Sequence, residues 1–199
     1  QAFQKISQNI DQAECIEDWY NIIDELTDWS VIFDNVSDHG LGQLLDEQWI
    51  DASRLFTKFI ETHYQIWLKG GDRPVMSPDI LPQFVQNHLE NNEKVVLILM
   101  DCLRSDQLKA MTGQLSQVFH LETEYFLSIL PSATPYSRNA IFSGYFPSEL
   151  QGRYPDLWQK MWKNEKSMNQ FEEQFLKDYF TQNSLGSKSV HYHKILSYD

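Results

Sequence analysis

Residues 93–104, EKVVLILMDCLR, decide the predicted fold of this chain. Six large apolar residues stand together at 95–100, three of them are β-branched, and no polar residue alternates with them. Such a run is typical of a strand that is covered on both faces, as in the middle of an α/β sheet. Ligands bind beyond the carboxyl ends of the strands in such sheets, and Asp101 stands at that position. Asp101 is therefore a candidate functional residue.

The pattern repeats about thirty residues later. Residues 125–130, YFLSIL, predict a second strand, and residues 131–144 turn into a helix. If the two strands are parallel neighbours, Asp101 and Thr134 meet at one edge of the sheet. Thr134 precedes Pro135 at the start of the helix, where the helix dipole and unpaired N–H groups favour an anion beside the hydroxyl. Arg138 follows one turn later on the same face and is a candidate phosphate contact or support for the turn.

The sequence leaves two interpretations of these residues open. In one, Thr134 is a nucleophile, which needs a base or metal to activate it, and Asp101 holds a divalent metal. In the other, Asp101 and Thr134 only cap helices and Arg138 pairs with a surface acid. His191 and His193 alternate near the end of the chain, as a metal pair would, but we expect them to be structural.

The first ninety residues show helical periodicity. Apolar stripes predict helices over about 13–36 and 41–68, and a shorter helix capped by Ser77 runs to about Asn91. Asp11 is the expected cap of the first stripe. We expect Trp29 and Phe33 to pack on the second helix near its residues 56–60.

Composition narrows the function classes. The 199 residues carry 28 acidic and 16 basic side chains, a net charge of −12, which opposes direct DNA binding. No run approaches the length of a membrane span, so no membrane association is expected. With only two cysteines, Cys15 and Cys102, a cytoplasmic location is predicted. The chain does not begin with Met, and we expect it to be a piece of a longer protein.

The two blocks 95–107 and 128–144 together resemble the opening of a PglZ domain, a branch of the alkaline phosphatase superfamily. Residues 1 to about 90 resemble the helical bundle that joins receiver and PglZ domains in response regulators of type IX secretion. The resemblance implies an α/β fold: an N-terminal all-α bundle at 1–91, and at 92–199 the first part of an alkaline-phosphatase-like parallel-sheet core, incomplete here. It also implies that Asp101 and Thr134 are zinc ligands and that Thr134 is the nucleophile.

The expected function is that of a two-component response regulator whose PglZ domain is a zinc-dependent phosphodiesterase or phosphatase acting on nucleotide-like phosphodiesters. The remaining metal ligands are expected beyond Asp199, so this piece alone should be inactive. Implied partners are the substrate, a sensor kinase that acts through a receiver domain, and a second copy in a homodimer. The alternative is a non-catalytic signalling module that binds a partner protein such as a sigma factor.

Overall fold

The structure is a computed structural model that describes residues 2–34, 39–163 and 168–195. Its contacts divide the chain into two compact units, each formed from two segments. The first unit comprises residues 1–74 and 102–125, and the second comprises residues 75–101 and 126–199. Each unit is described by itself.

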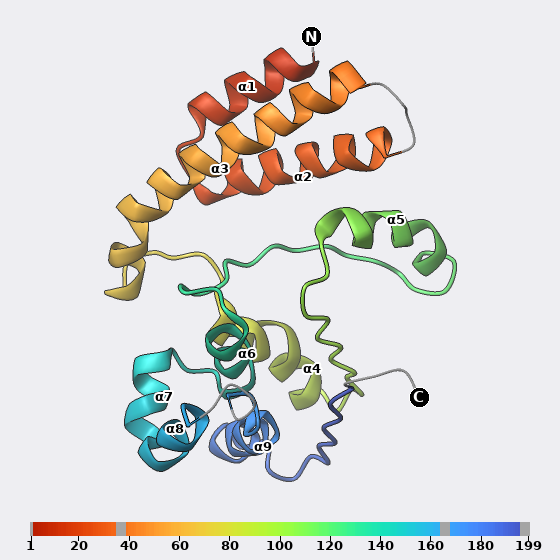
Figure 1. The fold of residues 1–199 in the computed structure, drawn as a ribbon. Coiled ribbons are helices and arrows are strands. Elements are labelled where there is room, and N and C mark those ends of the chain that lie inside the picture. Colours follow the sequence, from red (N-terminus) through yellow and green to blue (C-terminus); the bar gives the residue numbers. More distant parts are fainter. Residues whose placement is uncertain (1, 35–38, 164–167, 196–199) are drawn as a thin grey trace. The chain divides into compact units, whose positions relative to one another are not determined.

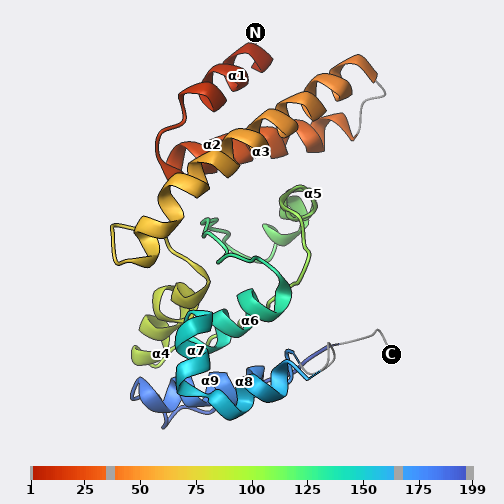
Figure 2. The same cartoon turned by 60° about the vertical axis from the view of Figure 1, so that its left-hand side comes forward.

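The first unit is a helical bundle built from α1 (Ala2–Gln12), α2 (Ile16–Phe33) and α3 (His39–Leu68). The three helices pack pairwise and lie side by side in Figures 1 and 2. The ring of Trp19, early in α2, lies 5.2 Å from the ring of Phe56, late in α3. The indole N–H of Trp49, early in α3, donates to the hydroxyl of Ser30 late in α2 (3.2 Å). α2 and α3 are therefore antiparallel, and the two helices predicted at about 13–36 and 41–68 are confirmed.

Two details of the prediction for this bundle are wrong. Trp29 packs not on residues 56–60 but on Phe3 of α1 (5.7 Å), because the antiparallel pairing brings the start of α2, not its end, to that part of α3. The cap of α2 is not Asp11, because α1 continues to Gln12. The carboxylate of Asp18 instead accepts the backbone N–H of Cys15 (3.0 Å), the residue that precedes α2.

α5 (Ser105–Leu115) also belongs to the first unit and packs on α2. The ammonium group of Lys109 lies 2.7 Å from the carboxylate of Asp24 and 2.6 Å from that of Asp28. The hydroxyl of Tyr125 donates to Asp24 as well (2.8 Å). The hydrogen bond from Lys109 lowers the pKa of Asp24, because it stabilises the charged carboxylate.

The second unit is made of short helices. The single helix predicted over residues 77–91 consists of a 3₁₀ turn, η1 (Ser77–Asp79), a π-helical segment, η2 (Pro82–Gln86), and α4 (Asn87–Glu90). The later helices are α6 (Thr134–Ser143), α7 (Pro147–Arg153), α8 (Pro155–Met161) and α9 (Glu172–Gln182). Gly144 ends α6 with φ +72°, and a Cβ there would lie 2.9 Å from the ring of Tyr179 on α9. Glycine thus permits both the turn and the close approach of the two helices.

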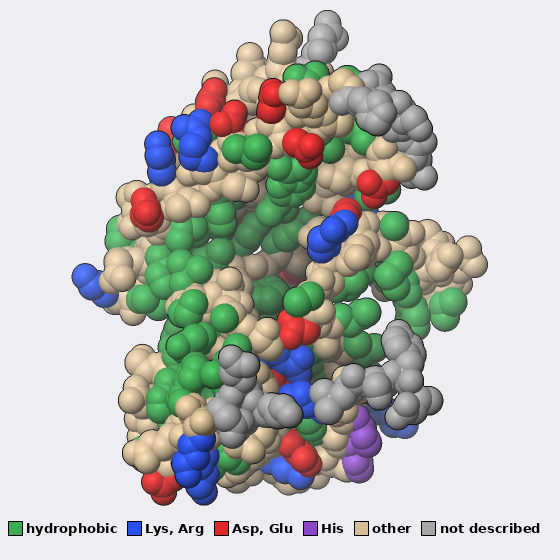
Figure 3. All heavy atoms as spheres, viewed as in Figure 1, with side chains coloured by type: hydrophobic (Ala, Val, Ile, Leu, Met, Phe, Trp, Pro, Cys, Tyr) green, Lys and Arg blue, Asp and Glu red, His purple; other side chains and the backbone are tan. Residues whose placement is uncertain are grey.

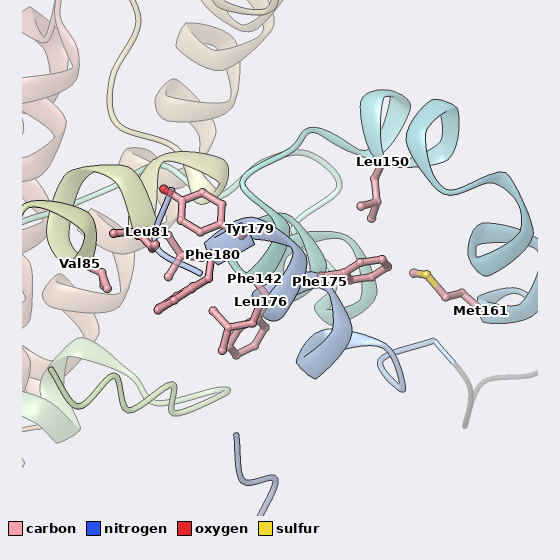
Figure 4. Packing of buried hydrophobic residues seen from close by; sticks show 10 residues of the cluster. Leu81, Val85, Phe142, Leu150, Met161, Phe175, Leu176, Tyr179 and Phe180 are labelled. Carbon is pink, nitrogen blue, oxygen red and sulfur yellow. The ribbon is translucent and has the colours of Figure 1, made fainter. Parts of the chain in front are cut away.

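The core of the second unit gathers around α9. Phe175, which is 1% exposed, points between Leu150 of α7 and Met161 of α8, and Tyr179 and Phe180 continue the apolar row toward Leu81 (Figure 4). These residues follow the 3.6-residue period of α9, so one face of the helix fills the centre of the unit. α6 packs along α9 and is held there by this core.

The strands predicted at 95–100 and 125–130 are not formed, and no strand is present in the described residues. Residues 93–100 trace an extended path in Figure 1, and Val95 and Leu99 pack against the core. Apolar side chains remain at the surface (Figure 3), and Val96 and Ile98 are 84% and 74% exposed. A strand forms only when a neighbour accepts its backbone hydrogen bonds, and residues 95–100 have none among the described residues. The prediction of a sheet core is thus not met by the described part of the chain.

One isolated parallel bridge joins Met76 to Leu127, and the backbone N–H of Leu127 donates to the carbonyl of Val75 (2.8 Å). The segment around Leu127 therefore pairs with residues that precede η1, not with residues 95–100 as predicted. No helix in the described ranges is both long and apolar enough to cross a membrane.

Candidate functional site

The first turn of α6 carries the candidate nucleophile. Thr134 is the first helical residue, Pro135 is the second, and the cap position belongs to Ala133, which has no side-chain oxygen. Within the described residues, no hydrogen bond engages the hydroxyl of Thr134, so Thr134 does not cap its own helix. The half-buried Thr134 lies at the N-terminus of α6, where the helix dipole stabilises negative charge. Pro135 has no N–H group, and those of Tyr136 and Ser137 donate to the carbonyl of Ala133 (2.9 and 3.1 Å).

Arg138, one turn further along α6, is fixed by a buried carboxylate. Its Nε and Nη2 donate to the two carboxylate oxygens of Glu172 at 2.7 and 2.8 Å. Glu172 is the first residue of α9 and is 0% exposed. The hydrogen bonds to Glu172 raise the pKa of Arg138, which stays charged. A bidentate pair of this kind fixes the position and the plane of the guanidinium.

Three further groups complete the partners of Glu172. Asn169 donates to one carboxylate oxygen at 3.0 Å, and the hydroxyl of Tyr192 donates to the other. The ammonium group of Lys194 lies 3.6 Å from the same oxygen as Tyr192. Burial first, and then the hydrogen bond to the Glu172 carboxylate, raise the pKa of Tyr192. The buried charge is thus fully surrounded by donors, as a stable buried carboxylate requires.

Asp101 joins this arrangement through Arg138. The third nitrogen of the guanidinium, Nη1, lies 3.7 Å from a carboxylate oxygen of Asp101, whose side chain is 42% exposed. The structure therefore places Asp101 beside the helix that begins with Thr134, although residues 95–100 form no strand. Arg138 thus connects the other two predicted site residues, because it shares α6 with Thr134 and lies close to Asp101.

A chain of hydroxyl groups anchors the segment that precedes α6. The hydroxyl of Ser137 lies 3.0 Å from that of Ser128 and 3.2 Å from that of Ser77, which is completely buried. Ser77 in turn accepts the backbone N–H of Ile129 (3.2 Å). The turn that leads into Thr134 is therefore anchored before it, at Ser128 and Ile129, and after it, at Ser137.

The two late histidines are not part of this arrangement. His191 and His193 are exposed, whereas Tyr192 between them packs toward the core. The imidazole Nε2 of His191 lies 3.0 Å from the hydroxyl of nearby Ser189. Among the described residues no group of three or more His, Cys, Asp or Glu side chains could hold a metal ion. These residues alone do not fit a zinc site, which takes three or four protein ligands.

Glu172 is the residue that the sequence reasoning missed. The sequence predicted that Arg138 would pair with a surface acid if the site were structural, but its partner is buried. A signal was present in the sequence, because Glu172 precedes Phe175, Leu176 and Tyr179 at spacings of three, four and seven residues. That spacing places a carboxylate on the apolar face of α9, where only a charged or strongly donating partner can accompany it.

Two models of known protein families match the chain. Residues 80–199, more than half of the chain, match the BREX system PglZ alkaline phosphatase-like domain, so the chain belongs to the PglZ family. Residues 1–68 match the PorX response regulator linker domain. The resemblance predicted from the sequence is confirmed: this is a PorX-like chain in which a response-regulator linker precedes a PglZ domain. No curated protein matches it.

Proposed function

We propose that this chain is part of a response regulator whose PglZ domain hydrolyses nucleotide-like phosphodiesters, with Thr134 as the nucleophile. One observation carries the proposal. Arg138, which Glu172 holds in one orientation, lies one turn after Thr134 and 3.7 Å from Asp101. A hydroxyl at a helix N-terminus, a fixed guanidinium and a carboxylate are three of the groups that phosphoryl transfer uses.

The residues divide the chemistry among them. The Thr134 oxygen attacks phosphorus, a bond from that oxygen to phosphorus forms, and the bond to the leaving alcohol breaks. The hydroxyl proton of Thr134 is lost as its oxygen attacks, and the leaving alcohol takes up a proton. Water then attacks the same phosphorus, the bond to Thr134 breaks, Thr134 regains its proton, and a phosphate monoester is released. The helix N-terminus favours the charge that develops at the attacked phosphate, and Nη1 of Arg138 can donate to one of its oxygens.

Zinc would be held by Asp101 and Thr134 together with ligands outside the described residues, and when bound it would activate the hydroxyl. We also propose that the apolar run 95–100 becomes a strand of a parallel sheet when neighbouring strands accept its backbone hydrogen bonds. Val95 and Leu99 already lie on the core, whereas Val96 and Ile98 remain uncovered, as expected for a strand with one face packed. The domain boundary at residue 91 and the role in type IX secretion remain predictions. The same holds for the expected partners, which are a sensor kinase, a sigma factor and a second copy in a homodimer.

The test uses the full-length parent protein. We expect zinc-dependent hydrolysis of bis-p-nitrophenyl phosphate. Asp101→Ala should lose bound zinc and activity together. Asp106→Ala, which changes a carboxylate five residues later in the sequence that is held by Arg104 (2.9 Å), should keep both. A parent that binds no zinc and hydrolyses no phosphodiester would contradict the proposal and favour the non-catalytic signalling module.

A further inference from the structure

A groove in the first unit is not used by the proposed function. It lies between the start of α2 and the last third of α3, and it encloses about 290 Å³. One wall carries the rings of Phe59, His63 and Trp67, and the rest carries the carboxylates of Glu14, Glu17 and Asp72. An aromatic wall beside several acids is a different environment from the Asp101 site.

The aromatic wall is a single face of α3. Its residues recur every four positions, which brings their side chains together on one side of the helix. The ring centroids of Phe59 and His63 are 4.1 Å apart, and those of His63 and Trp67 are 5.7 Å apart. Phe59 and Trp67 are 9% and 6% exposed, so the packing holds them in place. The wall therefore consists of aromatic rings that are fixed by their mutual packing.

A hydrogen bond fixes the ring of His63 in this wall. Its Nδ1 lies 2.8 Å from the carbonyl oxygen of Phe59, and because a carbonyl only accepts, Nδ1 is the donor.

The charge of the groove is negative. Three carboxylates line it against one guanidinium, that of Arg73, which donates to the carbonyl of Pro74 (3.3 Å). The N-terminus of α2 adds a partial positive charge of about 0.5. This partial charge is smaller than the net negative charge that three carboxylates and one guanidinium leave in the groove. Asp18, whose carboxylate caps α2, does not line the groove.

We propose that this groove binds a guanidinium group on a flexible aliphatic stem, the chemistry of an arginine side chain. A guanidinium stacks on aromatic faces, is weakly hydrated, and donates to several acceptors at once. The carboxylates of Glu14, Glu17 and Asp72 supply those acceptors. A compact ammonium group matches the wall less well, because it is strongly hydrated and has no planar face to stack.

Cys15 reports on occupancy, because its thiol is exposed and lines the same groove. The experiment follows alkylation of this chain by iodoacetamide, a neutral reagent, with n-butylguanidinium or its neutral isostere n-butylurea present. We expect millimolar n-butylguanidinium to slow the reaction of Cys15 at least threefold and n-butylurea to leave it unchanged. Cys102, also exposed, is the internal control and should not respond.

A variant tests the role of the acids. Glu14→Gln combined with Glu17→Gln should abolish the protection, while Glu122→Gln with Glu124→Gln, which changes exposed acids outside the groove, should keep it. N-acetyl-arginine amide distinguishes two sources of the group: stronger protection than by n-butylguanidinium indicates a protein side chain, and equal protection indicates a small free cation. Equal protection by n-butylurea, equal responses of Cys15 and Cys102, or no protection at all would overturn the proposal.

Discussion

Replacing Glu172 by Gln tests the arrangement that fixes Arg138. The change keeps the shape of the side chain and removes its charge. Glu172 is 0% exposed and accepts two hydrogen bonds from Arg138, whose side chain is only 17% exposed. Removing one partner of such a buried pair leaves the other charge without compensation, which typically costs ~3–5 kcal/mol. The amide oxygen still accepts one hydrogen bond, so we expect a loss of about 3 kcal/mol in the free energy of unfolding, at the lower end of that range.

The neighbouring residue supplies a matched control. The carboxylate of Glu173 lies 2.6 Å from the ammonium group of Lys177, and both side chains are about half exposed. An exposed pair at this helical spacing contributes only ~0.3–0.5 kcal/mol, so Glu173→Gln should be nearly neutral. Both variants make the same chemical change one residue apart in the same helix turn.

The assay is urea unfolding followed by circular dichroism, together with hydrogen exchange of the amides of α6 and α9. Because the chain has two units, the exchange data assign the loss to the second unit. Glu172→Gln should lower the protection of both helices and leave α2 and α3 unchanged. A free energy of unfolding equal to that of Glu173→Gln within 0.5 kcal/mol would refute the reasoning that Glu172 holds α6 to α9.

Three further predictions concern other parts of the chain. Phe175→Ala, which opens a cavity at the centre of the second unit, should cost ~3–5 kcal/mol in urea unfolding, and a loss below 1 kcal/mol would contradict the core assignment. The pKa of Tyr192 is raised in the folded state, so its contribution to stability is fully present below about pH 10, the unfolded value, and is lost as the pH rises further. The fall in stability between pH 9 and pH 11 should therefore be smaller in Tyr192→Phe than in the parent. Burial raises the pKa of Tyr179 to about 12, and Tyr179 contributes to the fall in both proteins. An equal fall in the two proteins would contradict the role of Tyr192. Finally, this chain alone should bind zinc weakly in equilibrium dialysis, because its described residues offer no cluster of three ligands, and stoichiometric zinc retained through dialysis would contradict that expectation.

The helical part of the fold follows from local sequence patterns. The apolar stripes of α2 and α3 predict both helices to within a few residues, because side chains on one face of a helix recur with a fixed period. Which residues of the two stripes meet depends on how the helices pair, so the partner of Trp29 was not predictable from the stripe alone. The turn before α2 also escaped prediction, since Asp18 and not Asp11 supplies the capping oxygen.

The prediction of a sheet was not met for a different physical reason. The run 95–100 has the composition of a doubly covered strand, but composition does not supply the neighbouring strands that satisfy its backbone. The spacing of Thr134 and Arg138 on one helix was predictable, as was the position of Asp101 at the end of the apolar run. The link between them was not, because it depends on Glu172, which is distant in sequence from all three.

The most direct measurement of the central claim compares three forms of the full-length parent in the hydrolysis of bis-p-nitrophenyl phosphate with zinc added: the parent, Thr134→Ser and Thr134→Ala. If Thr134 is the nucleophile, the serine variant keeps the attacking oxygen and measurable activity. The alanine variant loses activity while its melting temperature stays close to that of the parent, because the hydroxyl caps no helix. Full activity of a normally folded Thr134→Ala protein would contradict the account and remove Thr134 from the reaction.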